Sequence, residues 1–278
     1  MVRRGVKLSI GCALAVCAIL LLGTPDAVRA QQVEPEKPSK DPHEVQPERP
    51  TVATHAGTVA PGWLELEVGG EWDRYPDGGK VLSFPGNLKV GLSPRAQLNI
   101  LATGFRETAT DPTARGVGDV TLGVKYRLID DGPFVGDFAI LPAVKFPTAA
   151  SAGGLGTGTT DVSLLLISSH SVGPADVDIN LGITRRSGDG VKAPKTSSVW
   201  TVSAGAPIAG RIGWTGEIYG YPGTKGPAGA KPIVAILTGP TYQVAKWLAT
   251  DAGLIEPLTG PQPRALYAGL VWNIGKLP

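Results

Sequence analysis

The chain has 278 residues, of which 42% are hydrophobic and 18% charged, and its 26 basic residues nearly balance 24 acidic ones. This balance gives no basic surface of the kind that binds nucleic acid, so no nucleic-acid partner is expected. Cys12 and Cys17, its two cysteines, lie near the N-terminus, which leaves the remaining sequence without disulfide or thiolate chemistry.

The first thirty residues have the three-part pattern of a secretory signal peptide. Basic residues come first, an apolar run follows from Leu8 to Gly23, and Val28-Arg29-Ala30 offers small residues for cleavage. The run is shorter than the roughly 18 apolar residues of a transmembrane helix, so a cleaved signal is favoured over a retained anchor. Cleavage near Ala30 removes residues 1–30, and with them both cysteines, four bases and one acid, leaving 22 bases and 23 acids.

Residues 31–50 are polar and mixed in charge, and five prolines interrupt them, at positions 35, 38, 42, 47 and 50. Proline blocks regular structure, so this stretch is expected to be a disordered linker. The following residues, 51–278, contain no second low-complexity break and are expected to form one β-barrel domain.

Alternation of apolar and polar residues is the main structural signal in 51–278. Leu64, Leu66 and Val68 alternate with acidic residues, and the same pattern recurs at 119–128, 177–184 and 266–274. Period two predicts strands with one polar face. Less regular candidates, separated by Gly, Pro and Asp turns, bring the expected total to about twelve strands: 80–92, 96–106, 134–146, 159–172, 197–206, 211–221, 232–244 and 247–255.

Two architectures use such strands. A soluble sandwich buries its apolar face, whereas a membrane barrel turns that face to lipid and keeps a polar interior. About twelve strands in 51–278 allow roughly 19 residues for each strand and connection, which suits membrane-spanning strands. We therefore predict an all-β, antiparallel up-and-down transmembrane β-barrel. Pro85, Pro142 and Pro240 fall inside strand candidates, so bulges or shifted strand boundaries are needed there.

Several blocks of sequence carry a family resemblance. They include Pro61 to Glu67, Leu88 to Leu98, Leu141 to Thr148 and Asp178 to Arg186, and the most characteristic is Gly116 to Leu128, which reads GVGDVTLGVKYRL. In content and order these blocks resemble a family of outer-membrane transporters related to the protein of the meta-cleavage pathway of phenol degradation. The resemblance implies a barrel of about twelve strands that passes small, often apolar compounds across the outer membrane.

Charged and amide side chains in mid-strand are the candidate lumen-lining residues, because a water-filled interior would solvate and pair them. The alternative is that they only hold the barrel together. The candidates are Glu65, Glu67, Glu71, Asp119, Lys125, Arg127, Asp178, Asn180, Arg185 and Arg186.

No catalytic, metal or cofactor site is predicted. The glycine-rich run 153–158 lacks the lysine and helix of a phosphate loop, and we interpret it as a hairpin loop. Ser168 and His170 share a strand face, but no orienting acid or oxyanion motif accompanies them. His43, His55 and His170 are too dispersed for a metal site.

The sequence thus predicts a monomeric outer-membrane channel or transporter for small molecules, including aromatic or hydrophobic ones. Its expected partners are outer-membrane lipid, a small-molecule solute and, during biogenesis, the barrel assembly machinery. One alternative is a non-transporting structural or binding β protein of the cell envelope, either a plugged barrel or a periplasmic sandwich. The other is a barrel enzyme that uses Ser168 and His170.

Overall fold

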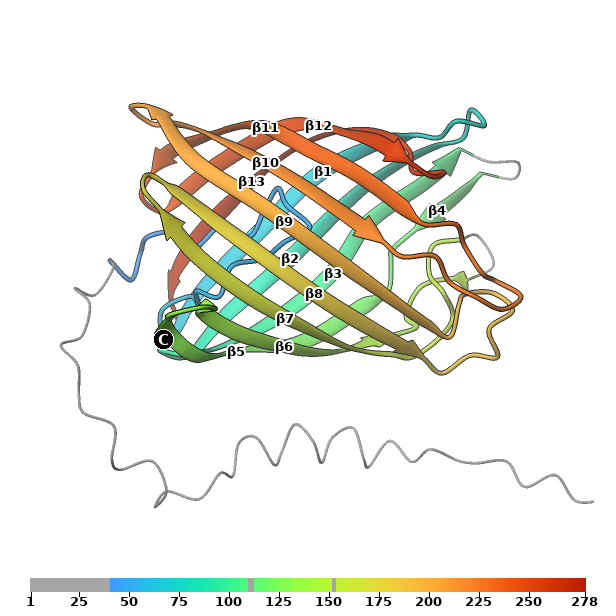
Figure 1. Ribbon diagram of the computed structural model, residues 1–278, viewed down its shortest axis with the longest axis horizontal. Helices are drawn as coiled ribbons and strands as arrows, with labels where there is room; N and C mark the ends of the chain where they lie inside the picture. The colour runs from blue at the N-terminus through green and yellow to red at the C-terminus, as the bar shows by residue number, and fades with distance from the viewer. Residues whose placement is uncertain (1–40, 110–112, 152–153) are drawn as a thin grey trace, which may run out of the picture. The chain divides into compact units, whose positions relative to one another are not determined.

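The computed structural model describes residues 41–109, 113–151 and 154–278, which form a closed antiparallel β-barrel (Figure 1). The described strands are β1 (Trp63–Arg74), β2 (Lys80–Ser93), β3 (Ala96–Ala109), β4 (Ala114–Gly116), β5 (Val120–Gly132), β6 (Gly136–Phe146), β7 (Asp161–Val172), β8 (Ala175–Arg186), β9 (Thr196–Ala209), β10 (Ile212–Tyr221), β11 (Ile233–Ala245), β12 (Leu248–Thr259) and β13 (Arg264–Lys276).

Twelve of these strands form the wall. Each pairs antiparallel with its neighbours in the chain, and β1 pairs with both β2 and β13, which closes the sheet. The short β4 pairs only with the end of β3, while β3 pairs directly with β5 along its first half. The predicted all-β barrel of about twelve strands is confirmed.

The two ends of the barrel differ in their connections. Turns of two or three residues, such as 94–95, 173–174 and 246–247, lie at the end that also holds the start of β1 and the end of β13, and we call this end the turn rim. The opposite end, the loop rim, carries longer connections such as 147–160 and 222–232. In outer-membrane barrels the short turns are on the periplasmic side.

Apolar side chains cover the outside of the wall. Along β8, Ile179, Leu181 and Ile183 are exposed, whereas Asn180 between them is fully buried. The same inversion holds around the barrel, where the exposed outward residues include Val68, Leu122, Leu164, Val202, Ile218, Leu254 and Leu266. An apolar exterior around a polar interior is the arrangement of a lipid-facing barrel and the reverse of a water-soluble sandwich.

The prolines inside strands lie where pairing is irregular. Pro85 adjoins a register shift between β2 and β3. At Pro240 the β11–β12 pairing skips from Thr238 to Thr241, and at Pro142 the β5–β6 pairing skips from Ala143 to Ile140. Because proline lacks an amide donor, these gaps accommodate it without leaving a broken ladder bond.

The linker expected to end at Pro50 needs a correction. Residues 41–50 are not a free tether: together with 51–60 they lie inside the barrel and bond to side chains of its wall (Figure 1). Proline content indicated only the lack of regular structure, and this segment is irregular yet held by contacts that the local sequence does not reveal. The predicted signal peptide and residues 31–40 lie outside the described residues. No helix in the described part of the chain is long and apolar enough to cross a membrane.

The outer apolar surface gives a direct prediction. Leu181 lies midway along β8 and is 56% exposed. If lipid covers it, Leu181→Arg should destabilise the barrel by about 2–4 kcal/mol. Val191→Arg, in a loop and 62% exposed, is the matched control and should change stability little. Urea unfolding in liposomes measures both, and equal effects of the two changes would contradict a lipid-facing wall.

Candidate functional site: a plug within the barrel

Residues 41–60, here called the plug, contact strands around the whole circumference. They bond to side chains of β1, β2, β3, β5, β7, β8, β10, β12 and β13. One segment can reach so many strands of a closed barrel only from inside it. Most of the residues contacted lie in the turn-side half of the wall, and Asn180 and Glu217 lie near the middle of their strands.

The plug has no strand or helix of its own, so its main-chain amides need other acceptors. Wall side chains supply them. Gln46 donates its amide to Glu65 and Glu48 donates to Glu67, at 2.8 and 2.7 Å. Further along, the amides of Val52 and Ala53 both donate to Glu217, at 2.8 and 2.7 Å.

The same pattern continues to the end of the plug. Asn180 accepts from the Thr54 amide at 2.7 Å and donates to the Thr54 carbonyl at 2.9 Å. The amides of Ala56 and Val59 donate to Ser169 and Gln97, each at 2.8 Å. The inward polar side chains of the wall therefore supply the hydrogen-bond partners that a backbone without regular secondary structure lacks.

Arg49 forms the most specific side-chain contact of the plug. Its guanidinium donates from Nε and Nη2 to the two carboxylate oxygens of Asp251, at 3.1 and 3.0 Å. It lies against Gly69 and Gly269, which are paired across β1 and β13, and a Cβ atom added at either would come within 2.4 Å of it. These two glycines leave the space that the guanidinium occupies.

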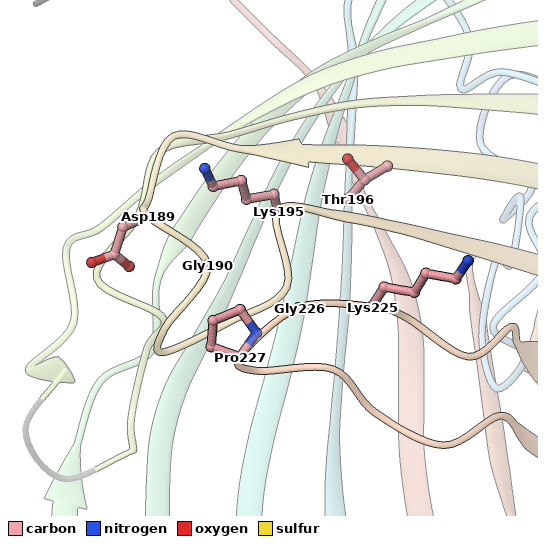
Figure 2. A pocket seen from close by; sticks show the side chains of 7 residues that line it. All are labelled: Asp189, Gly190, Lys195, Thr196, Lys225, Gly226 and Pro227. Carbon is pink, nitrogen blue, oxygen red and sulfur yellow. The ribbon is translucent and has the colours of Figure 1, made fainter.

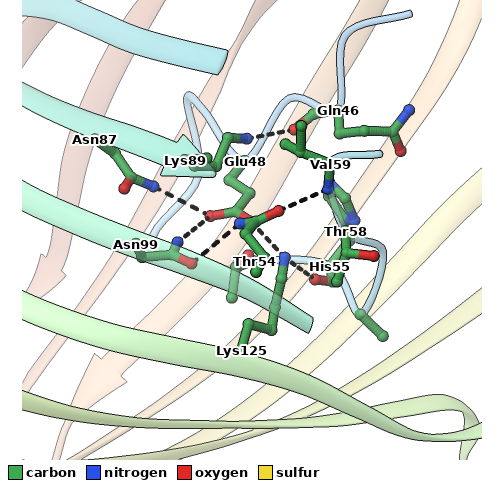
Figure 3. Close-up of polar contacts among 12 residues, drawn as sticks. Gln46, Glu48, Thr54, His55, Thr58, Val59, Asn87, Lys89, Asn99 and Lys125 are labelled. Atoms are coloured by element: carbon green, nitrogen blue, oxygen red, sulfur yellow. Dashed lines mark hydrogen bonds and ion pairs between the residues drawn. The ribbon is translucent and has the colours of Figure 1, made fainter. Parts of the chain in front are cut away.

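Glu48 is held by four donors from three adjacent strands (Figure 3). Its Oε1 accepts from Gln97 at 3.1 Å and from Lys125, and its Oε2 accepts from Asn87 at 3.3 Å and Asn99 at 3.4 Å. Gln97 also donates to Asn99, at 3.1 Å, which fixes the two amides relative to each other.

Lys89 completes the charged network. Its side chain is fully buried and lies 2.7 Å from Glu65 and 2.8 Å from Glu67, and it also donates to the Gln46 carbonyl at 2.6 Å. A buried ammonium is costly unless paired and hydrogen-bonded. Lys89 meets that requirement with two wall carboxylates and one plug carbonyl.

This network shifts the pKa values of two plug residues. Burial opposes ionisation of Glu48, but Lys125 and Lys89 outweigh it and hold the pKa of this carboxyl well below its usual range. Burial and then the charge of Lys125 lower the pKa of His55 to about 3. His55 keeps some surface area, but protein atoms surround it on most sides, so we interpret it as a neutral imidazole at physiological pH.

At the turn rim, aromatic rings clamp the start of the plug. The ring of His43 lies 5.0 Å from that of Trp63 and 6.3 Å from that of Trp247, centroid to centroid. Asn273 donates to the carbonyls of Pro42 and Glu44, at 3.1 and 3.4 Å. The chain thus enters the barrel at the turn rim, beside the start of β1, the end of β13 and the β11–β12 turn.

The loop-side half of the lumen differs in character. Tyr219, Leu237, Ile255 and Tyr267 form a buried cluster, and the Tyr219 hydroxyl accepts from Gln262 at 2.6 Å. On the opposite wall, Lys145 pairs with Asp119 at 2.8 Å and Asp161 at 3.3 Å. Between the plug and the loop rim, the lumen therefore has an apolar, aromatic side and a charged side.

Nine of the ten predicted lumen-lining residues lie on the inward face or near the rims. Glu65, Glu67, Lys125 and Asn180 point inward and bond to the plug or to its partners, and Asp178 points inward and accepts from Ser169 at 2.5 Å. Closer to the rims, Arg186 lies 3.3 Å from Asp161, Asp119 precedes β5, and Arg127 lies 2.6 Å from Asp130. Glu71 shares the inward face of Glu67.

Arg185 differs from the expectation. It is exposed on the same face as Ile183 and bonds to Thr196 at 2.8 Å. Adjacent residues of a strand point to opposite faces, so Arg185 and Arg186 cannot both face the lumen.

Sequence reasoning did not single out several residues of the site: Glu48, Arg49, Lys89, Gln97, Asn99, Glu217 and Asp251. Those on strands lie at alternating positions, and that periodicity is the signal that could have found them. For Glu48 and Arg49 the local sequence carries no such signal.

Ser168 and His170 do lie together, as the strand period requires, but on the outer face. Ser168 Oγ is 2.9 Å from His170 Nε2 and donates to the Val135 carbonyl at 2.6 Å. Since the hydroxyl proton is committed to that carbonyl, the imidazole donates to Oγ rather than accepting from it. This is the reverse of the arrangement that activates a serine nucleophile.

A separate pocket of about 420 Å³ lies at the loop rim between loops 187–195 and 222–232 (Figure 2). Lys195, Lys225 and Asp189 are among its lining residues, and Ala228 donates its amide to the Gly190 carbonyl at 3.0 Å between the two loops. None of these residues bonds to the plug in the described structure, so the pocket is distinct from the lumen site.

Of the comparisons with known proteins, only the one with solved structures found matches. No protein-family model matches the chain, and no curated protein matches it. An outer membrane channel from Pseudomonas putida F1 is similar in structure, with a TM-score of 0.60, 13% identity, and coverage of 78% of this chain and 97% of that one. The similarity shows a shared barrel fold.

Two autotransporter domains are similar at lower scores. The β domain of the Bordetella autotransporter BrkA has a TM-score of 0.48 at 15% identity, covering 77% of this chain and all of that one. The translocator domain of NalP from Neisseria meningitidis has a TM-score of 0.47 at 10% identity, covering 76% of this chain and 88% of that one.

The role of the space that Gly69 and Gly269 leave for Arg49 can be tested directly. Gly269→Ala puts a methyl group where the guanidinium lies, so the pairing with Asp251 should weaken and the plug should loosen. Ala53, which is 1% exposed, can be replaced by cysteine as a reporter, and its maleimide labelling should become at least about tenfold faster, equivalent to about 1.4 kcal/mol. At Gly205 an added Cβ would meet its nearest atom at 3.6 Å, so Gly205→Ala is the control and should leave labelling unchanged.

Acid should also loosen the plug. A released plug binds a proton at His55 as pH falls below about 6.5, whereas the seated one resists until about pH 3, so acid favours release across this window. Glu48, whose pKa is lowered in the seated plug, adds to the same effect below about pH 4.5.

Labelling of Ala53→Cys, normalised to the unfolded protein at each pH, should rise between pH 7 and 5 by up to about 25-fold. His55→Asn should abolish most of that rise. A flat profile in the protein with His55 intact would contradict the assignment of a neutral, enclosed imidazole.

Proposed function

We propose that this protein is an outer-membrane channel for small solutes and that the plug closes it from the turn side. The closed wall, the apolar exterior and the polar lumen support a membrane-spanning pore. The likeness of fold to an outer membrane channel supports the same class of function.

The observation that carries the proposal is the way the plug is held. Most of its specific contacts with the wall are hydrogen bonds and ion pairs, such as Arg49 with Asp251 and Glu48 with Lys125, and its apolar contacts are two small clusters around Val45 and Ala56. Water and dissolved ions can replace such partners, whereas they cannot replace the contacts of an apolar core. A plug fixed in this way is suited to leave and return.

The remaining parts of the proposal concern placement and cargo. We infer export by the signal peptide, cleavage near Ala30, folding by the barrel assembly machinery and function as a monomer in outer-membrane lipid. The turn rim then faces the periplasm, and the plug enters from that side. Resemblance to the phenol meta-pathway family and the aromatic cluster around Tyr219 and Tyr267 support small aromatic or hydrophobic solutes.

A permanently plugged barrel is the second candidate, and the number of bonds between plug and wall favours it. It would serve as a structural or binding protein of the envelope and would conduct nothing. We do not propose catalysis, because Ser168 is not activated by His170.

Conductance in planar bilayers separates the two candidates. Asp251→Asn leaves Arg49 without its carboxylate partner, so channel openings should become at least about tenfold more frequent than in the unmodified protein. Arg264→Ala removes another arginine–carboxylate pair, an exposed one at the loop rim, and should change nothing. If Asp251→Asn, Arg49→Ala and Gly269→Ala all stay closed while folded, the channel proposal fails and the permanent plug stands.

A further inference from the structure

The wall contains a carboxylate receptor that Glu48 fills. Four donors, Lys125 and the amides of Asn87, Gln97 and Asn99, converge on one carboxylate and supply two bonds to each oxygen (Figure 3). Planar carboxylates take such paired donors well, and bonds from a charged donor are the stronger ones.

All four donors belong to the wall rather than to the plug. Gln97 and Lys125 face each other in the register of β3 and β5, and Asn99 lies two residues from Gln97 on the same face. The bond from Gln97 to Asn99 is also internal to the wall. Departure of the plug would therefore leave the donor set in place.

The departure of Glu48 changes the charge balance at the receptor. Lys125 is fully buried and Glu48 is its ion-pair partner. The neighbouring carboxylates, Glu65 and Glu67, are both held by Lys89, at 2.7 and 2.8 Å. Lys125 would then face the lumen without a counterion, and a solute anion could take the place of the Glu48 carboxylate.

The kind of acceptor sets Glu48 apart. Elsewhere in the lumen, plug amides donate to wall acceptors, as in Ala53 to Glu217, and wall side chains donate to plug carbonyls, as in Asn180 to Thr54. At Glu48 the wall side chains donate to a carboxylate of the plug. This is the contact in which a small solute with a carboxylate could substitute for the plug atom for atom.

We propose that the channel takes small carboxylate anions and that Glu48 occupies their binding site when the plug is seated. This inference rests on the proposed function, since it names the class of solute that the channel passes. Glu48 then acts as a built-in competitor: the solute and the plug exclude each other at Lys125.

The test is to remove the Glu48 carboxylate from the full chain and to replace it with acetate. Glu48→Ala, combined with the Ala53→Cys reporter, should label faster with maleimide because the plug has lost this contact. Acetate should enter the emptied receptor, restore the partner of Lys125 and slow the labelling several-fold. Acetamide has the same shape without the charge and should have no effect.

Two further variants are controls. Glu48→Ala with Lys125→Met should label fast with or without acetate, because the charged donor is gone. Arg49→Ala loosens the plug elsewhere while Glu48 remains in the receptor, so acetate should not slow its labelling. Glu48→Ser offers a second route to the same vacancy if Glu48→Ala folds poorly, and heat-modifiable migration in electrophoresis identifies the folded fraction.

The transport arm uses liposomes that contain the Asp251→Asn protein. Benzoate should pass faster than benzamide, and Lys125→Met should remove that preference. A channel that conducts but shows neither acetate protection nor a benzoate preference overturns the carboxylate inference and leaves the proposed function intact. Absence of flux through the Asp251→Asn, Arg49→Ala and Gly269→Ala proteins overturns the proposed function. Acetate protection of the Glu48→Ala protein would still show that the receptor binds a carboxylate.

Discussion

Everything in the turn-side lumen depends on one constraint: a polar group enclosed in a barrel must find a partner, because little water is available to it. The wall carries inward carboxylates, amides and lysines, and the plug carries an irregular backbone with free amides. Each set would be costly to bury alone. Together they satisfy each other, as in Glu217, whose two oxygens accept from Val52 and Ala53.

The same constraint separates the two halves of the lumen. In the turn-side half, three inward glycines, Gly69, Gly91 and Gly269, leave room for the plug to approach the wall. In the loop-side half, Tyr219 and Tyr267 fill the space with their own rings, and Gly239 and Gly253 accommodate the Tyr267 hydroxyl. Inward glycines thus make room for the plug in one half of the lumen and for the Tyr267 side chain in the other.

Whether the plug can leave and return depends on the kind of contact that holds it against the wall. Burial of apolar area would hold a plug in a way that solutes could not influence, because the hydrophobic effect has no specific competitor. Ion pairs such as Arg49 with Asp251 and Lys125 with Glu48 do have competitors, namely other anions and cations of suitable shape. A channel closed mainly by polar contacts can therefore respond to the chemistry of the solute it carries.

Sequence alone predicted the wall well. Period two located the strands within a few residues, for example Lys80–Ser93 where 80–92 was expected, and it assigned Glu65, Glu67, Lys125 and Asn180 to the inner face. The predictions for Arg185 and for residues 41–50 were wrong, for different reasons. Arg185 was grouped with Arg186 by charge although strand geometry separates them. The plug is held only by contacts distant in sequence, such as Thr54 with Asn180, and no local pattern encodes those.

The central claim, that the plug closes the pore, can be tested by tethering. Thr54 and Asn180 exchange two hydrogen bonds, at 2.7 and 2.9 Å, so cysteines at these positions lie within reach of a short, reducible bis-thiol cross-linker. In the Asp251→Asn background, conductance should disappear when the two cysteines are joined and return on reduction, while each single cysteine has no such switch. Undiminished conductance through the tethered protein would contradict the claim.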